Sequence, residues 1–175
     1  MKNVVITGRT RGIGLAMALE FLQAGCNVTL SGRGEALPDA ALDKLSPYKG
    51  RYIYVKCNVQ DKASLQDLWD ASLKRWGRVD IWINNAGQNV PHMFSWETGE
   101  AYTENVIRTN IIGMIYGSQI AAAGMLKQGH GAIYSMEGLG SNNMVQPKTI
   151  LYGTTKCALT YYIRDWPKSL RAPAS

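Results

Sequence analysis

A tyrosine and a lysine, Tyr152 and Lys156, stand four residues apart in the stretch ILYGTTKCAL. If this stretch is helical, residues at i and i+4 share one face, so the ammonium lies alongside the phenol ring. A phenol can protonate a developing alkoxide, and nearby positive charge lowers its pKa from about 10, so that it can act as a base in the reverse reaction. The alternative is an ordinary helix surface, on which the lysine stem covers the ring. We predict a reactive pair with Tyr152 as the acid/base.

A glycine-rich turn, VVITGRTRGIGLAMAL, joins an apolar run near the N-terminus to a helix-like stretch. Gly8 can make the sharp turn, Gly12 lets the backbone approach a pyrophosphate, and Gly14 lets helix and strand pack closely. The start of the helix offers free N–H groups and partial positive charge to phosphates. The spacing TGxxxGIG differs from GxGxxG, and the alternative is a tight connection without a ligand. We predict that a dinucleotide is bound here by Gly8, Arg9, Thr10, Arg11, Gly12, Ile13 and Gly14.

The second strand, NVTLSGRG, predicts which dinucleotide is bound. A carboxylate at the end of this strand would bind the ribose hydroxyls of NAD, and the sequence has none there. Arg33 follows the strand and Arg11 precedes Gly12, so both can reach a 2′-phosphate through charge-assisted contacts. A solvated loop charge is the alternative for each arginine, and for Arg9 it is an equally good one. We therefore predict NADP(H) in preference to NAD(H).

The composition favours a folded protein that acts on a small molecule. The 175 residues are 46% hydrophobic and 18% charged, which suits one well-buried core. The net charge is +6, but the basic residues are scattered, so we expect no nucleic-acid partner. Cys26, Cys57 and Cys157 lack zinc-like or disulfide spacing, and no segment is apolar enough to span a membrane. These features predict no metal, no membrane association and a cytoplasmic location.

Short β-branched runs alternate with longer helical stretches along the chain. The runs are NVVIT, NVTLS, YIYVKC, VDIWIN and AIYSM. Gly25 and Gly77 close two of the helical stretches, and a longer one extends from near Tyr102 to Lys127. Such alternation is typical of α/β proteins with a doubly wound parallel sheet. Because no repeat or linker divides the chain, we predict a single domain over residues 1–175.

Four motifs occur in one order: TGRTRGIG, the NNAG of Asn84 to Gly87, Asn110 in TNIIG, and the YxxxK of Tyr152 and Lys156. In this combination the chain resembles the short-chain dehydrogenase/reductase family over nearly its whole length. The resemblance implies a Rossmann-type sheet of strand order 3-2-1-4-5. It also implies that Asn110 holds a water linking Lys156 to solvent. The catalytic residues it implies are Asn110, Tyr152 and Lys156, with further cofactor contacts from Asn58, Val59, Asn85, Ala86, Gly87, Tyr152 and Lys156.

Within the family, DIWINNAGQN and IYSMEGLGSN followed by YGTTKCAL look most like the chlorophyll(ide) b reductases and their bacterial relatives. By that resemblance, the protein reduces a formyl group to a hydroxymethyl group with NADPH. Members of the family assemble through the long helix and the tyrosine helix. The resemblance therefore implies a homo-oligomer, either a dimer or a tetramer.

One departure from the family pattern concerns the substrate oxygen. The family carries a serine just after the fifth strand to bind that oxygen, and the strand register places Gly138 there. Ser141, Glu137 or backbone groups could replace the serine, while Ser135 is expected inside the strand. The loss of one oxyanion donor typically costs ~10²-fold or more in rate.

A second departure lies at the C-terminal end. The later strands of the family are absent, so the fifth strand is expected to be a bare sheet edge. Pro167 stands where a helix should continue, at a cost of ~3 kcal/mol in a helix interior. Codons for Leu-Ala-Lys-Glu that lose their first base can encode Trp166 to Ser169. We therefore expect a frameshift or a shortened gene, which resequencing of the gene would test.

Three hypotheses for function follow. The first is an NADPH-dependent reductase that converts an aldehyde or ketone to an alcohol. A 3-oxoacyl or sugar reductase of the same family is the second. The third is an inactive cofactor-binding fragment or pseudoenzyme, which Gly138 and the shortened chain favour, or a subunit that binds a partner.

Overall fold

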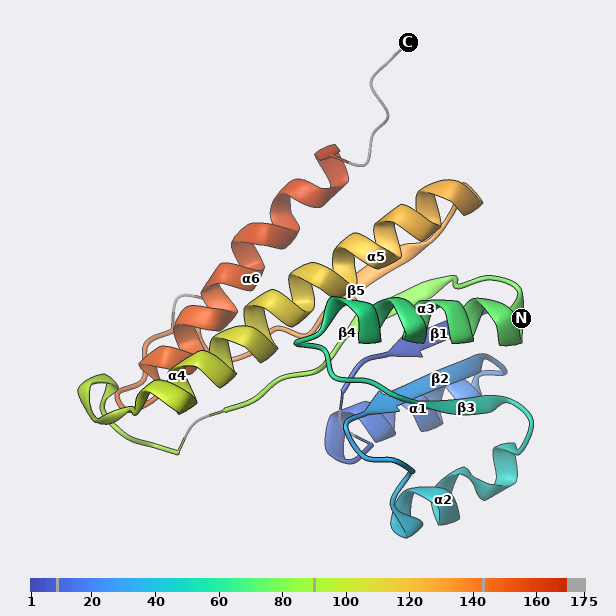
Figure 1. The fold of residues 1–175 in the computed structure, drawn as a ribbon, viewed down its shortest axis with the longest axis horizontal. Coiled ribbons are helices and arrows are strands. Elements are labelled where there is room, and N and C mark those ends of the chain that lie inside the picture. Colours follow the sequence, from blue (N-terminus) through green and yellow to red (C-terminus); the bar gives the residue numbers. More distant parts are fainter. Residues whose placement is uncertain (9, 90, 143, 170–175) are drawn as a thin grey trace.

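The computed structural model describes residues 1–8, 10–89, 91–142 and 144–169, with the backbone alone at 165 and 167–169. Its centre is a five-stranded parallel sheet of order β3-β2-β1-β4-β5 (Figure 1). The strands are β1 (Asn3–Ile6), β2 (Asn27–Gly32), β3 (Tyr52–Lys56), β4 (Ile81–Asn84) and β5 (Ala132–Ser135). This order confirms the Rossmann-type α/β fold predicted from the sequence.

Helices connect the strands and cover both faces of the sheet. In the described part of the chain they are α1 (Gly12–Gln23), α2 (Asp39–Leu45), α3 (Lys62–Trp76), α4 (Glu100–Ile107), α5 (Gly113–Gln128) and α6 (Ile150–Ser169). Short 3-10 turns lie at Ser46–Tyr48 and Ser95–Glu97. The predicted ends at Gly25 and Gly77 are confirmed, since both glycines have positive φ, 84° and 79°, just after α1 and α3.

The central strand β1 divides its side chains between two cores. Val4 and Ile6 pack with α1 and α2 on one face of the sheet, whereas Val5 packs with α3 and α5 on the other. All three side chains are at most 1% exposed. Successive strand residues point to opposite faces, and both faces are buried here. For that reason NVVIT is a continuous apolar run without polar alternation.

The stretch expected to be one long helix is divided by a π-helical turn. This turn, Arg108–Ile112, lies between α4 and α5 and contains Asn110. Single π turns inside helices occur frequently at functional sites, because the inserted residue changes which side chains face inward. The sequence pattern alone did not predict this turn.

Helix α5 lies unusually close to its neighbours because three of its residues have no Cβ. A Cβ on Gly113 would come within 2.9 Å of Val59, and one on Gly124 within 2.0 Å of the Trp69 ring. At Gly117 it would meet the Asn84 side chain at 2.6 Å. These glycines bring α5 against α3 and against the carboxyl end of β4, where the candidate site begins.

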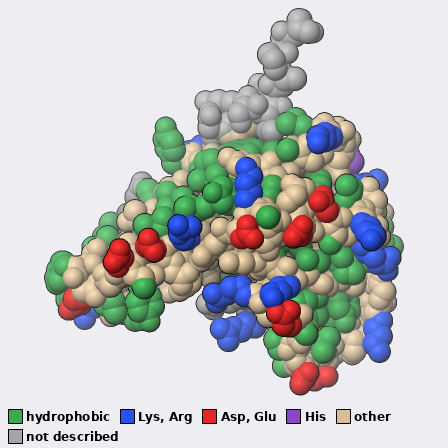
Figure 2. Space-filling view, in the orientation of Figure 1, with side chains coloured by type: hydrophobic (Ala, Val, Ile, Leu, Met, Phe, Trp, Pro, Cys, Tyr) green, Lys and Arg blue, Asp and Glu red, His purple; other side chains and the backbone are tan. Residues whose placement is uncertain are grey.

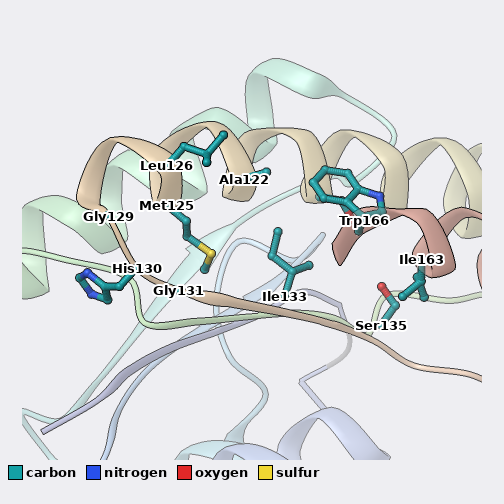
Figure 3. Close-up of a pocket in the computed structure, with 11 residues that line it drawn as sticks. Ala122, Met125, Leu126, Gly129, His130, Gly131, Ile133, Ser135, Ile163 and Trp166 are labelled. Atoms are coloured by element: carbon teal, nitrogen blue, oxygen red, sulfur yellow. The ribbon is translucent and has the colours of Figure 1, made fainter. Parts of the chain in front are cut away.

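Strand β5 lies at the end of the sheet and pairs with β4 alone among the described residues. Beside its free edge, α5 and α6 enclose a mostly apolar cavity of about 350 Å³ (Figure 3). Met125, Ile133, Ile163 and Trp166 are among the side chains that line it. The bare edge predicted for the fifth strand is confirmed for the described residues. Helix α6 continues through Pro167 to its end.

The surface carries mixed charge. On the face seen in Figure 2, Lys and Arg side chains are spread widely and lie among Asp and Glu side chains. No helix in the described ranges combines the length and the apolar character needed to cross a bilayer. Within those ranges, no group of three His, Cys, Asp or Glu side chains is arranged to hold a metal ion.

Candidate functional site

The candidate site is a groove at the carboxyl ends of the strands, where ligands bind in open α/β sheets. Two cavities of about 530 and 470 Å³ lie there, and they share Arg11, Gly87, Gln88 and Asn89 as lining residues. The larger one extends to the end of β2, and the smaller one to the start of α6. Because they share these lining residues, the two cavities are neighbours, and between them they reach from the second strand to the tyrosine–lysine pair.

Nearly all the residues predicted to bind the cofactor line this groove. In the larger cavity they are Gly8, Thr10, Arg11, Arg33, Asn58, Val59, Ala86 and Gly87, and in the smaller one Arg11, Gly12, Ile13, Gly14, Asn85, Gly87, Tyr152 and Lys156. Arg9 lies outside the described residues. Asn110 lines neither cavity and is buried behind them.

Glycine is required in the turn before α1 for a second reason besides the curvature of the turn. Gly8 has a φ of +86°, and a Cβ there would lie 2.5 Å from the Ala86 Cα. The turn therefore touches the backbone of the NNAG segment, which only glycine permits. Gly12 also has positive φ, +58°, and faces open space, while Gly14 is a buried residue in the first turn of α1. The turn leaves room for a phosphate at the start of α1.

The larger cavity has basic side chains near the end of β2. Arg11 and Arg33 both line this cavity. None of the described residues that line it is Asp or Glu. An NAD-type site would offer a carboxylate to the ribose hydroxyls, and two guanidinium groups suit an additional phosphate instead. The residues present therefore fit NADP better than NAD.

Buried hydrogen bonds hold the NNAG segment to its neighbours. The Asn84 amide donates to the Ser118 hydroxyl at 2.9 Å, and its oxygen accepts from the Trp82 indole at 2.9 Å. The Asn85 amide donates to the Thr7 carbonyl at 2.9 Å. These two asparagines therefore fix the end of β4 against β1 and α5. Sequence reasoning missed Thr7 and Ser118, which only the packing brings next to the motif.

Asn110 joins the loop after NNAG to α6. Its oxygen accepts from the Gln88 backbone N–H at 2.7 Å, and its amide donates to the Gln88 carbonyl at 2.9 Å and to the Thr155 hydroxyl at 3.0 Å. Both amide protons are therefore engaged by the protein, and one lone pair of the oxygen remains. The water that the family resemblance implies could bind only to that lone pair, so its presence stays a prediction.

Tyr152 and Lys156 lie on one face of α6 and line the same cavity. The Lys156 Nζ lies 5.6 Å from the centre of the Tyr152 ring and donates to the Met136 carbonyl at 2.7 Å. Lys156 is buried, with 5% of its surface exposed. Sequence reasoning missed the role of Met136, because no side-chain signal marks a backbone carbonyl as an acceptor.

Burial shifts the pKa values of the pair in opposite directions. It raises the pKa of the Tyr152 phenol, and it lowers the pKa of the Lys156 ammonium, which the Glu137 carboxylate opposes. For the oxidation direction, the sequence predicted that Lys156, together with an oxidised nicotinamide nearby, would lower the pKa of Tyr152. In this structure the ammonium binds the Met136 carbonyl instead, and desolvation of the phenol dominates. A protonated phenol suits reduction.

Position 138 lies directly against the tyrosine hydroxyl. A Cβ on Gly138 would come within 2.6 Å of the Tyr152 oxygen, so the strand register used for the family serine is supported. The Ser141 hydroxyl accepts a hydrogen bond from the Gly138 N–H at 3.0 Å. The Ser141 backbone N–H donates to the Gly138 carbonyl, also at 3.0 Å. Glu137 lines the cavity, and Ser135 lies inside β5 as predicted. The structure therefore brings both proposed replacements, Ser141 and Glu137, next to the position of the missing serine.

The sequence as a whole matches a known family. The sequence model described as "short chain dehydrogenase" matches residues 2–172. The chain belongs to the short-chain dehydrogenase family. It is 35% identical to the chloroplastic chlorophyll(ide) b reductase NOL of Arabidopsis thaliana, over 97% of this chain and 49% of that protein. It is 34% identical to the probable chlorophyll(ide) b reductase NYC1 of the same plant, over 92% of this chain and 36% of that protein.

Solved structures agree with this membership. The chain superposes on ElxO with NADP bound with a TM-score of 0.84 and 31% identity, over 90% of this chain and 63% of ElxO. A short-chain dehydrogenase/reductase from Burkholderia phymatum in complex with NAD gives a TM-score of 0.89 and 28% identity, over 97% of this chain and 60% of that one. The resemblance inferred from the motifs is confirmed. The chain spans about half the length of the curated NOL protein it matches.

Proposed function

We propose that this protein is an NADPH-dependent reductase that converts a carbonyl group to an alcohol. The observation that carries the proposal is the placement of Tyr152 and Lys156 on the cavity that continues from the glycine turn. The phenol of Tyr152 and the ammonium of Lys156 thus lie at the end of the proposed dinucleotide groove. Membership of the family and the ElxO structure with NADP bound support the proposal.

The cofactor would be held by backbone and basic groups along the groove. The start of α1 would bind the pyrophosphate, and Arg11 and Arg33 would bind the 2′-phosphate. Tyr152 and Lys156 would contact its nicotinamide end, in the smaller cavity. Bound NADPH supplies the hydride that reduces the carbonyl carbon.

The protein's own side chains supply the proton and the positive charge. The Tyr152 phenol, whose pKa burial raises, donates its proton to the substrate oxygen as negative charge develops there. Lys156 places positive charge beside the phenolate that remains. Asn110 holds the Gln88 loop and α6 in register, so the cavity keeps its shape.

The relatives indicate the substrate class. Two of them are named as chlorophyll(ide) b reductases, which supports a large substrate whose formyl group is reduced. A 3-oxoacyl or sugar reductase would use the same residues and remains the second candidate. Gly138 lies beside the Tyr152 hydroxyl, at the position where the family has a serine donor. The absence of that donor favours the third candidate, an inactive cofactor-binding protein. A homo-oligomer acting on a small molecule, in the cytoplasm, also stays a prediction.

Two measurements test the proposal. Titration with NADPH, followed by its fluorescence, measures binding, and oxidation of NADPH with a panel of aldehydes and ketones measures turnover. The expected result is binding together with turnover of at least one aldehyde. Tyr152→Phe is the matched control, and it should lower turnover by ~10²-fold or more with little change in NADPH affinity. Binding without any turnover would support the inactive cofactor-binding alternative.

A further inference from the structure

The arginine that we assign to the 2′-phosphate stands between two glycines at the end of β2. Arg33 lies between Gly32, the last residue of β2, and Gly34. Glycine has more backbone freedom than any other residue, so two glycines around one arginine leave its direction weakly determined. A phosphate contact that depends on Arg33 therefore needs something outside the turn to fix it.

The neighbouring strand β3 supplies that restraint. The Tyr54 hydroxyl donates to the Gly34 carbonyl at 2.7 Å, just after the arginine. The Cys57 N–H donates to the Gly32 carbonyl at 2.7 Å, just before it. The Lys56 ammonium also pairs with the Glu35 carboxylate. Because residues two apart in a strand point the same way, Tyr54 and Lys56 reach the turn from one face of β3.

Of these restraints, the tyrosine hydroxyl is the one whose side chain lines the cavity beside Arg33, and its hydrogen bond to Gly34 lies at the surface. The side chains of Lys56 and Glu35 are 57% and 83% exposed, and pairs exposed to that extent contribute little. Tyr54 is partly buried and lines the same cavity as Arg33. A Cβ at position 32 would come within 3.1 Å of its oxygen, so the small residue there leaves space for the contact. Burial, and then the Glu35 charge, raise the pKa of Tyr54, so the phenol remains a hydrogen-bond donor at neutral pH.

We propose that Tyr54 is a positioning residue for cofactor choice: by bonding the Gly34 carbonyl it holds Arg33 toward the 2′-phosphate of NADPH. Preference for NADPH over NADH then depends on β3 as well as on the arginine. The inference rests on the proposed NADPH dependence, but not on the identity of the substrate or on catalysis.

The test is a double-mutant cycle read by cofactor affinity. Dissociation constants for NADPH and NADH are measured by fluorescence titration for the wild type, Tyr54→Phe, Arg33→Ala and the double variant. Removing one hydrogen bond should weaken NADPH binding by about threefold to tenfold. NADH affinity should stay within about twofold, because no 2′-phosphate is present to lose the contact. On the Arg33→Ala background, Tyr54→Phe should have no further effect on NADPH, since the two residues act as one unit.

Tyr52→Phe is the matched control, because it removes a hydroxyl from the same strand two residues earlier, away from the turn. It should leave both affinities unchanged. Equal weakening of NADPH and NADH by Tyr54→Phe, or no weakening at all, would overturn the inference. So would a loss that persists on the Arg33→Ala background, since Tyr54 would then bind the phosphate itself. Because every readout is binding, a chain that shows this pattern but turns over no carbonyl refutes the proposed reductase and leaves the inference standing.

Discussion

At the scale of single residues, the site depends on how burial treats a phenol and an ammonium. Desolvation favours the uncharged form of each group, so it raises the pKa of Tyr152 and lowers that of Lys156. Burial therefore makes Lys156 lose its proton at a lower pH than a free lysine would. Glu137 opposes that loss, and Arg11 adds positive charge on the wall of the same cavity. Burial thus favours the protonated phenol that reduction needs, and it disfavours the charged form of the lysine beside it.

Glu137→Gln tests this balance. Without the carboxylate, burial acts on Lys156 unopposed, so the pKa of its ammonium falls further. The alkaline limb of kcat/KM for carbonyl reduction should therefore move to lower pH. Glu137→Asp keeps the charge and should shift the limb much less. A pH–rate profile of each variant is the measurement, and an alkaline limb in the same place for Glu137→Gln would contradict the assignment.

Gly138→Ser restores the family residue at its expected place. The new Cβ would lie 2.6 Å from the Tyr152 oxygen, so the tyrosine side chain has to shift. We expect an unchanged melting temperature but turnover lower by about 10-fold to 10²-fold, because displacement of a reacting group by 1 Å can cost that much. Gly138→Ala should behave alike, since it adds the same carbon without the hydroxyl. A serine variant faster than the natural protein would show that this chain merely lacks the family donor.

At the scale of elements, close packing of α5 positions the site. Missing Cβ atoms at Gly113, Gly117 and Gly124 let the helix touch Val59, Asn84 and Trp69. The π turn before α5 turns Asn110 inward, toward the Gln88 loop and α6. Small residues and one irregular turn thus connect β4, α5 and α6, the elements around the tyrosine–lysine pair.

Gly124→Ala should measure the strength of that packing. Its Cβ would lie 2.0 Å from a ring atom of Trp69, whose side chain is 4% exposed and has no free space to enter. Overpacking of this kind costs about 1–3 kcal/mol, so the free energy of unfolding in urea should fall by that amount. Ala123→Ser, on the exposed side of α5, should change it by no more than about 0.5 kcal/mol. Equal effects of the two substitutions would mean that α5 packs less closely than the structure indicates.

At the scale of the whole molecule, the groove and the free sheet edge lie in different places. The groove follows the carboxyl ends of the strands, while the apolar cavity lies beside β5, between α5 and α6. Tyr134, on that edge strand, is 57% exposed. Among the described residues this strand edge is uncovered, and such an edge can pair with another chain. The oligomer that the family resemblance implies uses the long helix and the tyrosine helix instead, and light scattering measures the oligomeric state directly.

Cofactor binding should stabilise the entire fold. A ligand that binds only the folded state, at 100 times its dissociation constant, raises the free energy of unfolding by about 2.7 kcal/mol. NADPH should produce this increase in urea denaturation, and NADH at the same concentration should produce less. A single transition in both cases would also agree with the predicted single domain. Equal stabilisation by the two cofactors would contradict the assignment of Arg11 and Arg33 to a 2′-phosphate.

Much of the site could be predicted because its parts are local in sequence. The apolar runs predicted the strands, Gly25 and Gly77 predicted helix ends, and the glycine turn lay where a βα unit begins. The spacing of Tyr152 and Lys156 predicted a shared helix face, and the structure places both on one cavity. Each of these signals depends only on short-range geometry, which periodicity and single residue types encode.

By itself, the amino-acid order determined the family, the order of the strands and many of the residues that line the groove. The tertiary structure decided which carbonyl Lys156 binds, that Asn110 is engaged by Gln88 and Thr155, and that Tyr54 reaches across to the arginine turn. These contacts join residues from separate strands, helices and loops. Only packing brings such groups together, and burial then sets the pKa directions that no pattern along the chain contains.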